Sequence, residues 1–215
     1  MNREVHSAKL VSITPDAEEQ IVYMARVSNP SNQNNMETAP RLIKYLIKHK
    51  HWSPFEMASM QVEVETTRAI AAQILRHRSF SFQEFSQRYS SVDQLGTVGL
   101  PHLRSQDLKN KQASHDDLDP EMVALMDRQI HQIYHNTFDY YEYLLSKGVA
   151  KECARSILPL GTPTKLYMSG TVRSFLHFCQ IRCGIETQLE HRLIANRIKD
   201  ILEEQLPSTY EAFFT

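Results

Sequence analysis

Residues 60–78 read MQVEVETTRAIAAQILRHR, and two kinds of periodicity meet in this stretch. Its first six residues alternate strictly between apolar and polar, which is typical of a strand with one buried face. The two threonines that follow can cap a helix, and the apolar spacing then becomes helical from Arg68 to about Arg78. A half-buried strand that leads directly into an amphipathic helix favours an α+β domain.

The flanking sequence adds more helices than strands. The apolar spacing and the turn residues predict a strand over 9–13, a helix opened by Thr14-Pro15, a helix from about 38, a long helix from Asp119-Pro120 to Lys147-Gly148, a short helix that stops at Pro159, a strand over 166–168, a helix capped by Thr171 and a last helix over about 187–204. The long helix is expected to turn Leu125, Met126, Ile130, Ile133, Tyr134, Tyr141 and Leu145 toward the core.

Residues 90–119 lack such spacing and are expected to form a long loop or excursion, which is usually functional or disordered at this length. The whole chain, 1–215, is predicted to be a single α+β domain. An antiparallel sheet would be flanked by several helices, including long C-terminal ones.

The composition excludes several classes of protein. The chain is 41% hydrophobic and 23% charged with a net charge of −1, as in an ordinary globular protein without a basic field for nucleic acid. No segment is apolar enough to cross a membrane, and the N-terminus does not resemble a signal peptide. The three cysteines are an odd number, which favours reduced thiols and a cytoplasmic location.

The sequence does not favour a metal site. Cys179 and Cys183 lie four residues apart, but only His177 and His191 could complete a ligand set, and their spacing is poor. Cys153 and Cys179 lie on apolar helix faces, where a thiol is usually part of the core.

A dense group of polar residues follows the predicted helix. Arg76-His77-Arg78 is followed by Ser86 and Arg88. Guanidinium groups stay charged and repel one another, so an anionic ligand with phosphates would complete the group economically. If the helix continues to Arg78, this arginine points about 200° away from Arg76, and the two arginines serve different ligands.

Three arginines elsewhere lie in sequence contexts that are unusual for ordinary surface residues. Arg155 interrupts an apolar helix, and Arg173 and Arg182 share one face of another. Arg68 is interpreted as a surface residue. Any one of these side chains is more often solvated or salt-bridged than functional. Together with the first group, however, they outnumber the acidic residues available to pair them in the same segments.

This set of residues resembles the flavin-dependent thymidylate synthases. Arg76-His77-Arg78, seven intervening residues and Ser86 form the signature of that family. The resemblance continues in order along nearly the whole chain. It includes Ala25 to Ser28, His51 to Glu56, Gln73, Glu84, Arg88-Tyr89, Ala154-Arg155, Leu158-Pro159, Arg173, Arg182, Gln188 and Glu190.

The resemblance implies the methylation of dUMP to dTMP with methylenetetrahydrofolate as carbon donor. Reduced FAD would supply the hydride, and NADPH would reduce the FAD. The active sites would lie between subunits of a homotetramer. The chain has only 6 glycines and no glycine-rich dinucleotide motif, so FAD would not be held by a Rossmann turn. None of the cysteines has the setting of an activated nucleophile, and hydride delivery by a flavin needs none.

The resemblance also assigns residues to ligands. For dUMP they are Gln73, Arg76, Glu84, Phe85, Ser86, Gln87, Arg88, Arg155 and Arg182, with Arg182 at the uracil edge as the catalytic residue. For FAD they are Ser53, Arg76, His77, Arg78, Glu84, Thr171, Arg173 and His177, and His51 would lie near the folate. Ser86 is interpreted as a phosphate-side ligand, because a hydroxyl beside arginines suits anion binding better than proton removal.

Three positions depart from the pattern of many bacterial members. Thr171 and His177 replace asparagines, and Glu186 replaces a histidine, which makes the FAD site the least determined part of the comparison. Residues Gln106 to Gln112 look more like members encoded by large DNA viruses and phages, in which case the location would be the host cytoplasm. A solvated loop would have the same polar composition.

Two other hypotheses remain open. The arginines together with Phe80, Phe82 and Phe85 could bind single-stranded nucleic acid by stacking, although the net charge and the scattered arginines argue against it. Steep salt dependence would identify such a binder. Alternatively, the chain could be an inactive family member that keeps only a structural role, against which the intact signature argues.

Overall fold

The computed structural model describes residues 2–96 and 98–215, and its centre is a four-stranded antiparallel sheet in the order β1-β2-β6-β3. The strands are β1 (Ser7–Ile13), β2 (Ser59–Thr67), β6 (Pro163–Thr171) and β3 (Ser81–Glu84). Two short strands, β4 (Ser105–Gln106) and β5 (Ser114–His115), form a separate hairpin. The α+β class predicted from the sequence is confirmed.

The helices account for most of the remaining chain. They are α1 (Ala17–Ala25), α2 (Ala39–Lys48), α3 (Arg68–Ile74), α4 (Pro120–Ser146), α5 (Lys151–Ala154), α6 (Val172–Arg182), α7 (Leu189–Gln205) and α8 (Pro207–Phe214). Four 3₁₀ turns complete the list: η1 (Pro30–Asn32), η2 (Ser53–Glu56), η3 (Val92–Leu95) and η4 (Arg155–Ile157). Among the described residues, no helix is both long and apolar enough to cross a membrane.

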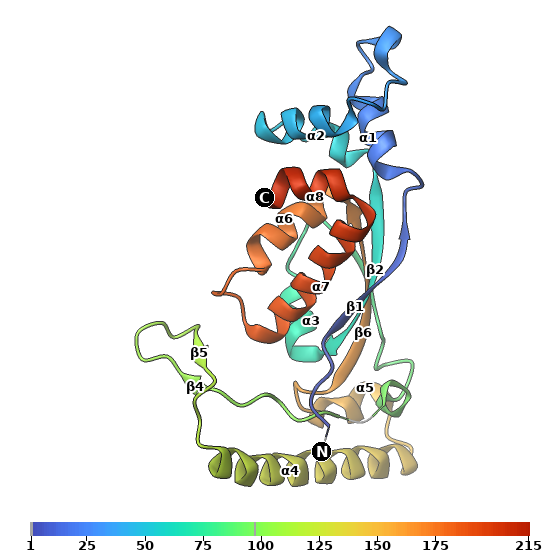
Figure 1. Ribbon diagram of the computed structural model, residues 1–215. Coiled ribbons are helices and arrows are strands. Elements are labelled where there is room, and N and C mark those ends of the chain that lie inside the picture. The colour runs from blue at the N-terminus through green and yellow to red at the C-terminus, as the bar shows by residue number, and fades with distance from the viewer. Residues whose placement is uncertain (1, 97) are drawn as a thin grey trace.

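The alternation in β2 separates a covered face of the sheet from a polar one. Met60, Val62 and Val64 are fully buried, whereas the intervening side chains are half-exposed. Helices α3, α6 and α7 pack against the covered face, as Figure 1 shows. On the polar face the hydroxyl of Tyr167 donates to Glu63 at 2.8 Å. The strand predicted from residues 60–65 is therefore confirmed, and its apolar residues belong to the main core.

Of the two helix caps predicted at Thr14 and Thr171, one is confirmed and the other is wrong. Thr171 caps α6, because its side-chain oxygen accepts from the backbone N–H of Ser174 at 3.2 Å. Thr14 does not cap α1. Its hydroxyl instead accepts from the backbone N–H of Ser59 at 2.9 Å, and α1 begins only at Ala17. The prediction was wrong because Thr14 joins the end of β1 to the start of β2.

Helix α4 has the predicted length, but only part of its predicted core face is buried. Asp119 caps it by accepting from the N–H of Met122 at 2.9 Å, and Gly148 follows its end with a φ of 81°. Only Tyr141 is fully buried, whereas Leu125 is 50% and Ile133 61% exposed. In Figure 1 the helix runs along one end of the molecule, away from α6, α7 and α8. It packs on a small second cluster, which leaves Leu125, Met126 and Ile133 of its apolar face exposed.

Replacing Leu166 with alanine tests the place of β6 in the core. Leu166 has no exposed surface, and we expect Leu166→Ala to lower the free energy of unfolding by about 2–5 kcal/mol. Leu108, which is 99% exposed in the hairpin loop, gives a matched control, and Leu108→Ala should change stability by less than about 0.5 kcal/mol. Urea unfolding at one protein concentration measures both. Equal effects of the two substitutions would contradict the burial described here.

Candidate active site

The arginine group follows a helix that ends sooner than its sequence suggests. Helix α3 stops at Ile74, and the chain turns so that the N–H of His77 bonds the carbonyl of Ile74 at 3.0 Å. The prediction of a helix to about Arg78, with Arg76 and Arg78 on opposite helix faces, was therefore wrong. The turn is imposed by aromatic packing, because the chain has to bring both His77 and Phe80 against the ring of Phe178.

Phe80 explains why the turn is tightly packed. Its side chain is 9% exposed, and its ring lies 4.9 Å from that of Phe175. Gly170 of β6 lies directly beneath it, where any Cβ would collide with the Phe80 ring. Phe80 is thus part of the core and is not available to stack on a base, which removes one of the aromatics on which the nucleic-acid hypothesis relied.

His77 holds the side chain of Arg182. The Nε of Arg182 donates to Nε2 of His77 at 2.9 Å, so His77 has to be neutral and to carry its proton on Nδ1. Burial, together with the positive charges of Arg182 and His177, lowers the pKa of His77 from 6.5 to about 4. The imidazole therefore remains an acceptor at neutral pH, and it orients the guanidinium without neutralising its charge.

Gln73 lies next to a second histidine of the site, His191. Its Oε1 is 3.3 Å from Nδ1 of His191, and its Nε2 donates to Gln188 at 2.7 Å. His191 is completely buried, and burial with the charge of Arg182 lowers its pKa to about 4. The rings of His77 and His191 lie 6.2 Å apart, so Gln73 and Arg182 approach the same region from α3 and α6.

The six arginines that the sequence singled out differ in their partners. Arg88 pairs with Glu152 at 3.1 Å, and Arg173 pairs with Glu56. Within the described part of the chain, the other four form no ion pair: Arg76, Arg78, Arg155 and Arg182. Uncompensated guanidinium groups at this density fit an anionic ligand.

Segment 81–88 carries the predicted nucleotide ligands in three different settings. Glu84 accepts from Arg68 at 2.5 Å and from Thr164 at 3.0 Å, so Arg68, interpreted from the sequence as a surface residue, is a partly exposed ion-pair partner of Glu84. Ser86 is exposed. Gln87 is 6% exposed, and its amide nitrogen has no partner among the described residues, which fits a site that expects an acceptor from a ligand.

Two of the predicted flavin residues, Arg173 and His177, line a pocket of about 600 Å³. It is lined by Trp52, Glu56, Ser79, Arg173 and His177, among others. Ser53 and Arg78 are chain neighbours of lining residues, and the exposed His51 lies on the same turn. The hydroxyl of Thr171 is engaged as the cap of α6. With Arg173, His177 and the nearby Arg78, the pocket offers the cations and donors that a phosphate-bearing group requires, so these residues fit FAD.

Not all predicted site residues come together in one chain. Arg155 lies in η4, directly after α5, and Arg88 pairs with Glu152 of α5. Figure 1 places α5 near the end of the sheet at which α4 lies, whereas the pocket with Arg173 lies by α6 and α8. The predicted phosphate ligands and the predicted flavin ligands are thus separated within the monomer.

Sequence reasoning missed His191 and Arg104 as parts of this region. His191 stands on the apolar face of α7 with Ile194 and Ile198, and a histidine at that spacing was the available signal. Arg104 lies in the irregular segment, where the sequence gave no such signal.

The cysteines are not arranged for catalysis. Cys179 is buried, which raises the pKa of its thiol, and Cys153 is exposed and not in the core as expected. No group of three or more metal-ligating side chains occurs among residues 2–96 and 98–215.

Stability should depend on pH through His77, which is half-buried, and His191, which is fully buried. Both have a pKa of about 4 in the folded protein instead of 6.5, so the unfolded chain binds more protons between these values. The free energy of unfolding should therefore decrease as the pH falls from about 6.5 to about 4. His77→Phe should make this decrease shallower in urea titrations across that range. An unchanged pH dependence in the variant would show that His77 is not buried in the neutral form.

Comparisons with known proteins show which family the chain resembles. A family model described as "Thymidylate synthase complementing protein" matches residues 9–208. A probable flavin-dependent thymidylate synthase of Paramecium bursaria Chlorella virus 1 is 49% identical and is aligned over 96% of this chain and 98% of its own length. A flavin-dependent thymidylate synthase of Synechocystis is 47% identical over 89% of this chain and 87% of its own.

A solved structure shares the fold. The UMP/dUMP methylase PolB from Streptomyces cacaoi, bound with 5-Br dUMP, superposes with a TM-score of 0.85 over 99% of this chain and 97% of its own, at 27% identity. The match of the family model over most of the chain, together with relatives close to half identical, shows that this chain is an enzyme of the flavin-dependent thymidylate synthase family.

Proposed function

We propose that this chain methylates dUMP to dTMP with methylenetetrahydrofolate as the carbon donor, FAD as the cofactor and NADPH as the reductant. The observation that carries the proposal is the setting of Arg182. Its guanidinium is held by a neutral histidine and has no carboxylate partner among the described residues, so its charge remains available to a ligand.

The nucleotide would be held by groups that suit a phosphate and a uracil edge. Arg88, Arg155 and the exposed Ser86 would bind the phosphate, with Phe85 and Gln87 in the same segment. The ion pair of Arg88 with Glu152 is exposed, and a phosphate can replace it at little cost. Glu84 would act from its pair with Arg68.

The catalytic role would belong to Arg182. Gln73 and Arg76 would contact the nucleotide beside it. A cation fixed at the uracil edge favours the ionised, more nucleophilic pyrimidine, and its orientation by His77 means that little reorganisation is needed when charge develops.

The flavin side would be formed around the pocket next to α6. We assign eight residues to FAD: Ser53 from η2, Arg76, His77, Arg78, Glu84, Thr171, Arg173 and His177. Bound reduced FAD would supply the hydride that completes the methyl group. His51, which is exposed and packs edge-on against Tyr45 at 5.9 Å, would lie at the folate end.

A homotetramer with active sites between subunits would reconcile the separated halves of the site. The phosphate ligands near α5 of one subunit could then face the flavin pocket of another. The large apolar side chains exposed on α4 support association, because covering Leu125, Met126 and Ile133 would remove apolar surface from water.

We place the enzyme in the cytoplasm, or in the host cytoplasm if it is viral, with small-molecule substrates.

Arg182→Ala separates catalysis from cofactor binding. Because Arg182 is proposed to act on uracil, the variant should retain its flavin and lose about 10²–10³-fold in kcat. Flavin absorption and dTMP formation measure the two effects. Arg197→Ala, which removes an exposed arginine of α7, is the matched control and should behave as wild type. Normal turnover of dUMP by Arg182→Ala would refute this assignment.

Arg78→Ala should show the opposite behaviour. Arg78 is exposed, forms no ion pair among the described residues and precedes Ser79, which lines the pocket. Losing this cation should weaken flavin binding about tenfold or more, because a charged hydrogen bond to phosphate disappears. The measurement is the flavin retained after gel filtration, again with Arg197→Ala beside it. A variant that stays fully yellow with unchanged flavin affinity would remove Arg78 from the cofactor site.

A further inference from the structure

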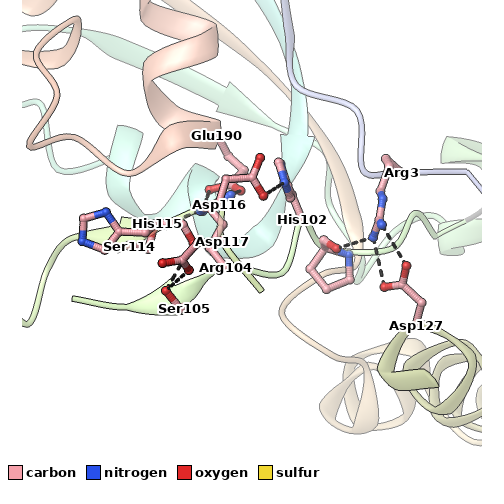
Figure 2. Close-up of polar contacts among 11 residues, drawn as sticks. Arg3, His102, Arg104, Ser105, Ser114, His115, Asp116, Asp117, Asp127 and Glu190 are labelled. Carbon is pink, nitrogen blue, oxygen red and sulfur yellow. Dashed lines mark hydrogen bonds and ion pairs between the residues drawn. The ribbon is translucent and has the colours of Figure 1, made fainter. Parts of the chain in front are cut away.

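The irregular segment before α4 is attached to the site by a buried ion pair. Nη1 and Nη2 of Arg104 bond Oε1 and Oε2 of Glu190 at 2.7 and 3.0 Å, as Figure 2 shows. The side chains are 12% and 8% exposed. The Nε of Arg104 donates to the hydroxyl of Ser114 at 2.9 Å, so the pair also holds the β4–β5 hairpin.

The ion pair between Arg104 and Glu190 does more than stabilise the fold. Burying two charges costs about as much free energy as their attraction returns, and apolar replacements of such pairs are often neutral or stabilising. What an ionised carboxylate provides with certainty is direction, since it can only accept hydrogen bonds. Burial raises the pKa of Glu190, but the hydrogen bonds from Arg104, from its own backbone and from Gln188 outweigh burial and keep it below 4.5.

Glu190 fixes the orientation of the neighbouring amide. Nε2 of Gln188 donates to Oε2 of Glu190 at 2.9 Å, and the reverse orientation would set the amide oxygen against a carboxylate. The oxygen of Gln188 therefore points to Gln73. Gln188 occupies the N-cap position of α7 but makes no side-chain capping bond, so its amide serves this bridge instead.

The same logic continues to Gln73 and His191. Because Gln188 presents its oxygen, Gln73 has to present its nitrogen, and the two atoms lie 2.7 Å apart. The oxygen of Gln73 then faces Nδ1 of His191 at 3.3 Å, which makes that nitrogen the donor. The amide nitrogen of Gln73 keeps one further hydrogen, and its amide oxygen keeps one further lone pair. Because the side chain is only half-buried, both atoms can reach a ligand.

The relay ends at a buried acceptor. His191 has no exposed surface, and its Nε2 has no partner among the described residues. With the proton on Nδ1, this buried nitrogen carries a lone pair. Donation thus runs from His191 to Gln73, from Gln73 to Gln188 and from Gln188 to Glu190, and the carboxylate of Glu190 also accepts from Arg104 on its other side.

We propose that Arg104 and Glu190 are positioning residues of the nucleotide site. Their ion pair imposes one donor–acceptor direction on Gln188, Gln73 and His191, so that Gln73 presents a fixed donor and a fixed acceptor to the bound nucleotide. The inference rests on the proposed function, in which Gln73 contacts dUMP. It makes the segment that carries Arg104 part of the active site.

A double-mutant cycle tests the relay. Glu190→Gln keeps the size and shape of the side chain but allows its amide, and those beyond it, to flip. We expect it to raise the Kd for dUMP about tenfold, as measured by the change in flavin absorption. Gln73→Ala should have a similar effect, and the double variant should be no weaker than Gln73→Ala within about twofold. A merely structural role of Glu190 would instead add to the effect of Gln73→Ala.

Matched variants complete the experiment. Arg104→Lys keeps a cation beside the carboxylate and should retain most of the affinity for dUMP. Glu204→Gln, which alters an exposed ion pair with Arg197 at 3.2 Å on the same helix, should change nothing. If Glu190→Gln does not fold, Gln188→Met replaces it in the cycle, because that exposed side chain caps no helix.

The outcomes are distinct. Full additivity, or wild-type affinity for dUMP in folded Glu190→Gln, would overturn the relay while leaving the proposed function intact. A wild-type protein that takes up no flavin, or whose bound flavin does not respond to dUMP, would overturn the proposed function and the role of the relay with it.

Discussion

The hydrogen bond from Arg182 to a neutral His77 is the interaction on which the rest of the site depends. It allows a guanidinium to be held in a defined place without a carboxylate. A carboxylate would have oriented Arg182 equally well but would have neutralised the charge that an anionic ligand needs. The histidine can play this part because partial burial beside Phe178 and the nearby charge of Arg182 lower its pKa, which keeps it unprotonated at neutral pH.

The pairing of the other charged residues is selective in the same way. The chain uses its acids sparingly near the signature: Glu84 is used on Arg68, Glu56 on Arg173 and Glu190 on Arg104. Four of the arginines that the resemblance assigns to ligands form no ion pair among the described residues, whereas Arg88 and Arg173 pair with Glu152 and Glu56. Both of these pairs are exposed, so an anionic ligand can replace the carboxylate at little cost.

The sequence predicted what depends on periodicity and missed what depends on packing between distant segments. The alternation in β2, the length of α4 and the Thr171 cap follow from local rules and were correct. The end of α3 was misplaced because helix propensity continues past Ile74, whereas His77 and Phe80 have to reach Phe178, a contact about a hundred residues away. Arg104 was invisible for the same reason, since its partner Glu190 lies 86 residues later.

The outward face of α4 shows how far a single chain accounts for this fold. An apolar stripe at helical spacing was interpreted as a core face, and the spacing itself was correct. What periodicity cannot distinguish is whether the core belongs to the same chain or to another copy. Tyr141 is fully buried, but Leu125, Met126 and Ile133 are exposed, so this part of the stripe is not covered by its own chain among the described residues. A site whose phosphate and flavin residues lie at opposite ends of the monomer has the same requirement. The proposed tetramer would satisfy both with one set of contacts, so assembly and catalysis would rest on the same helix.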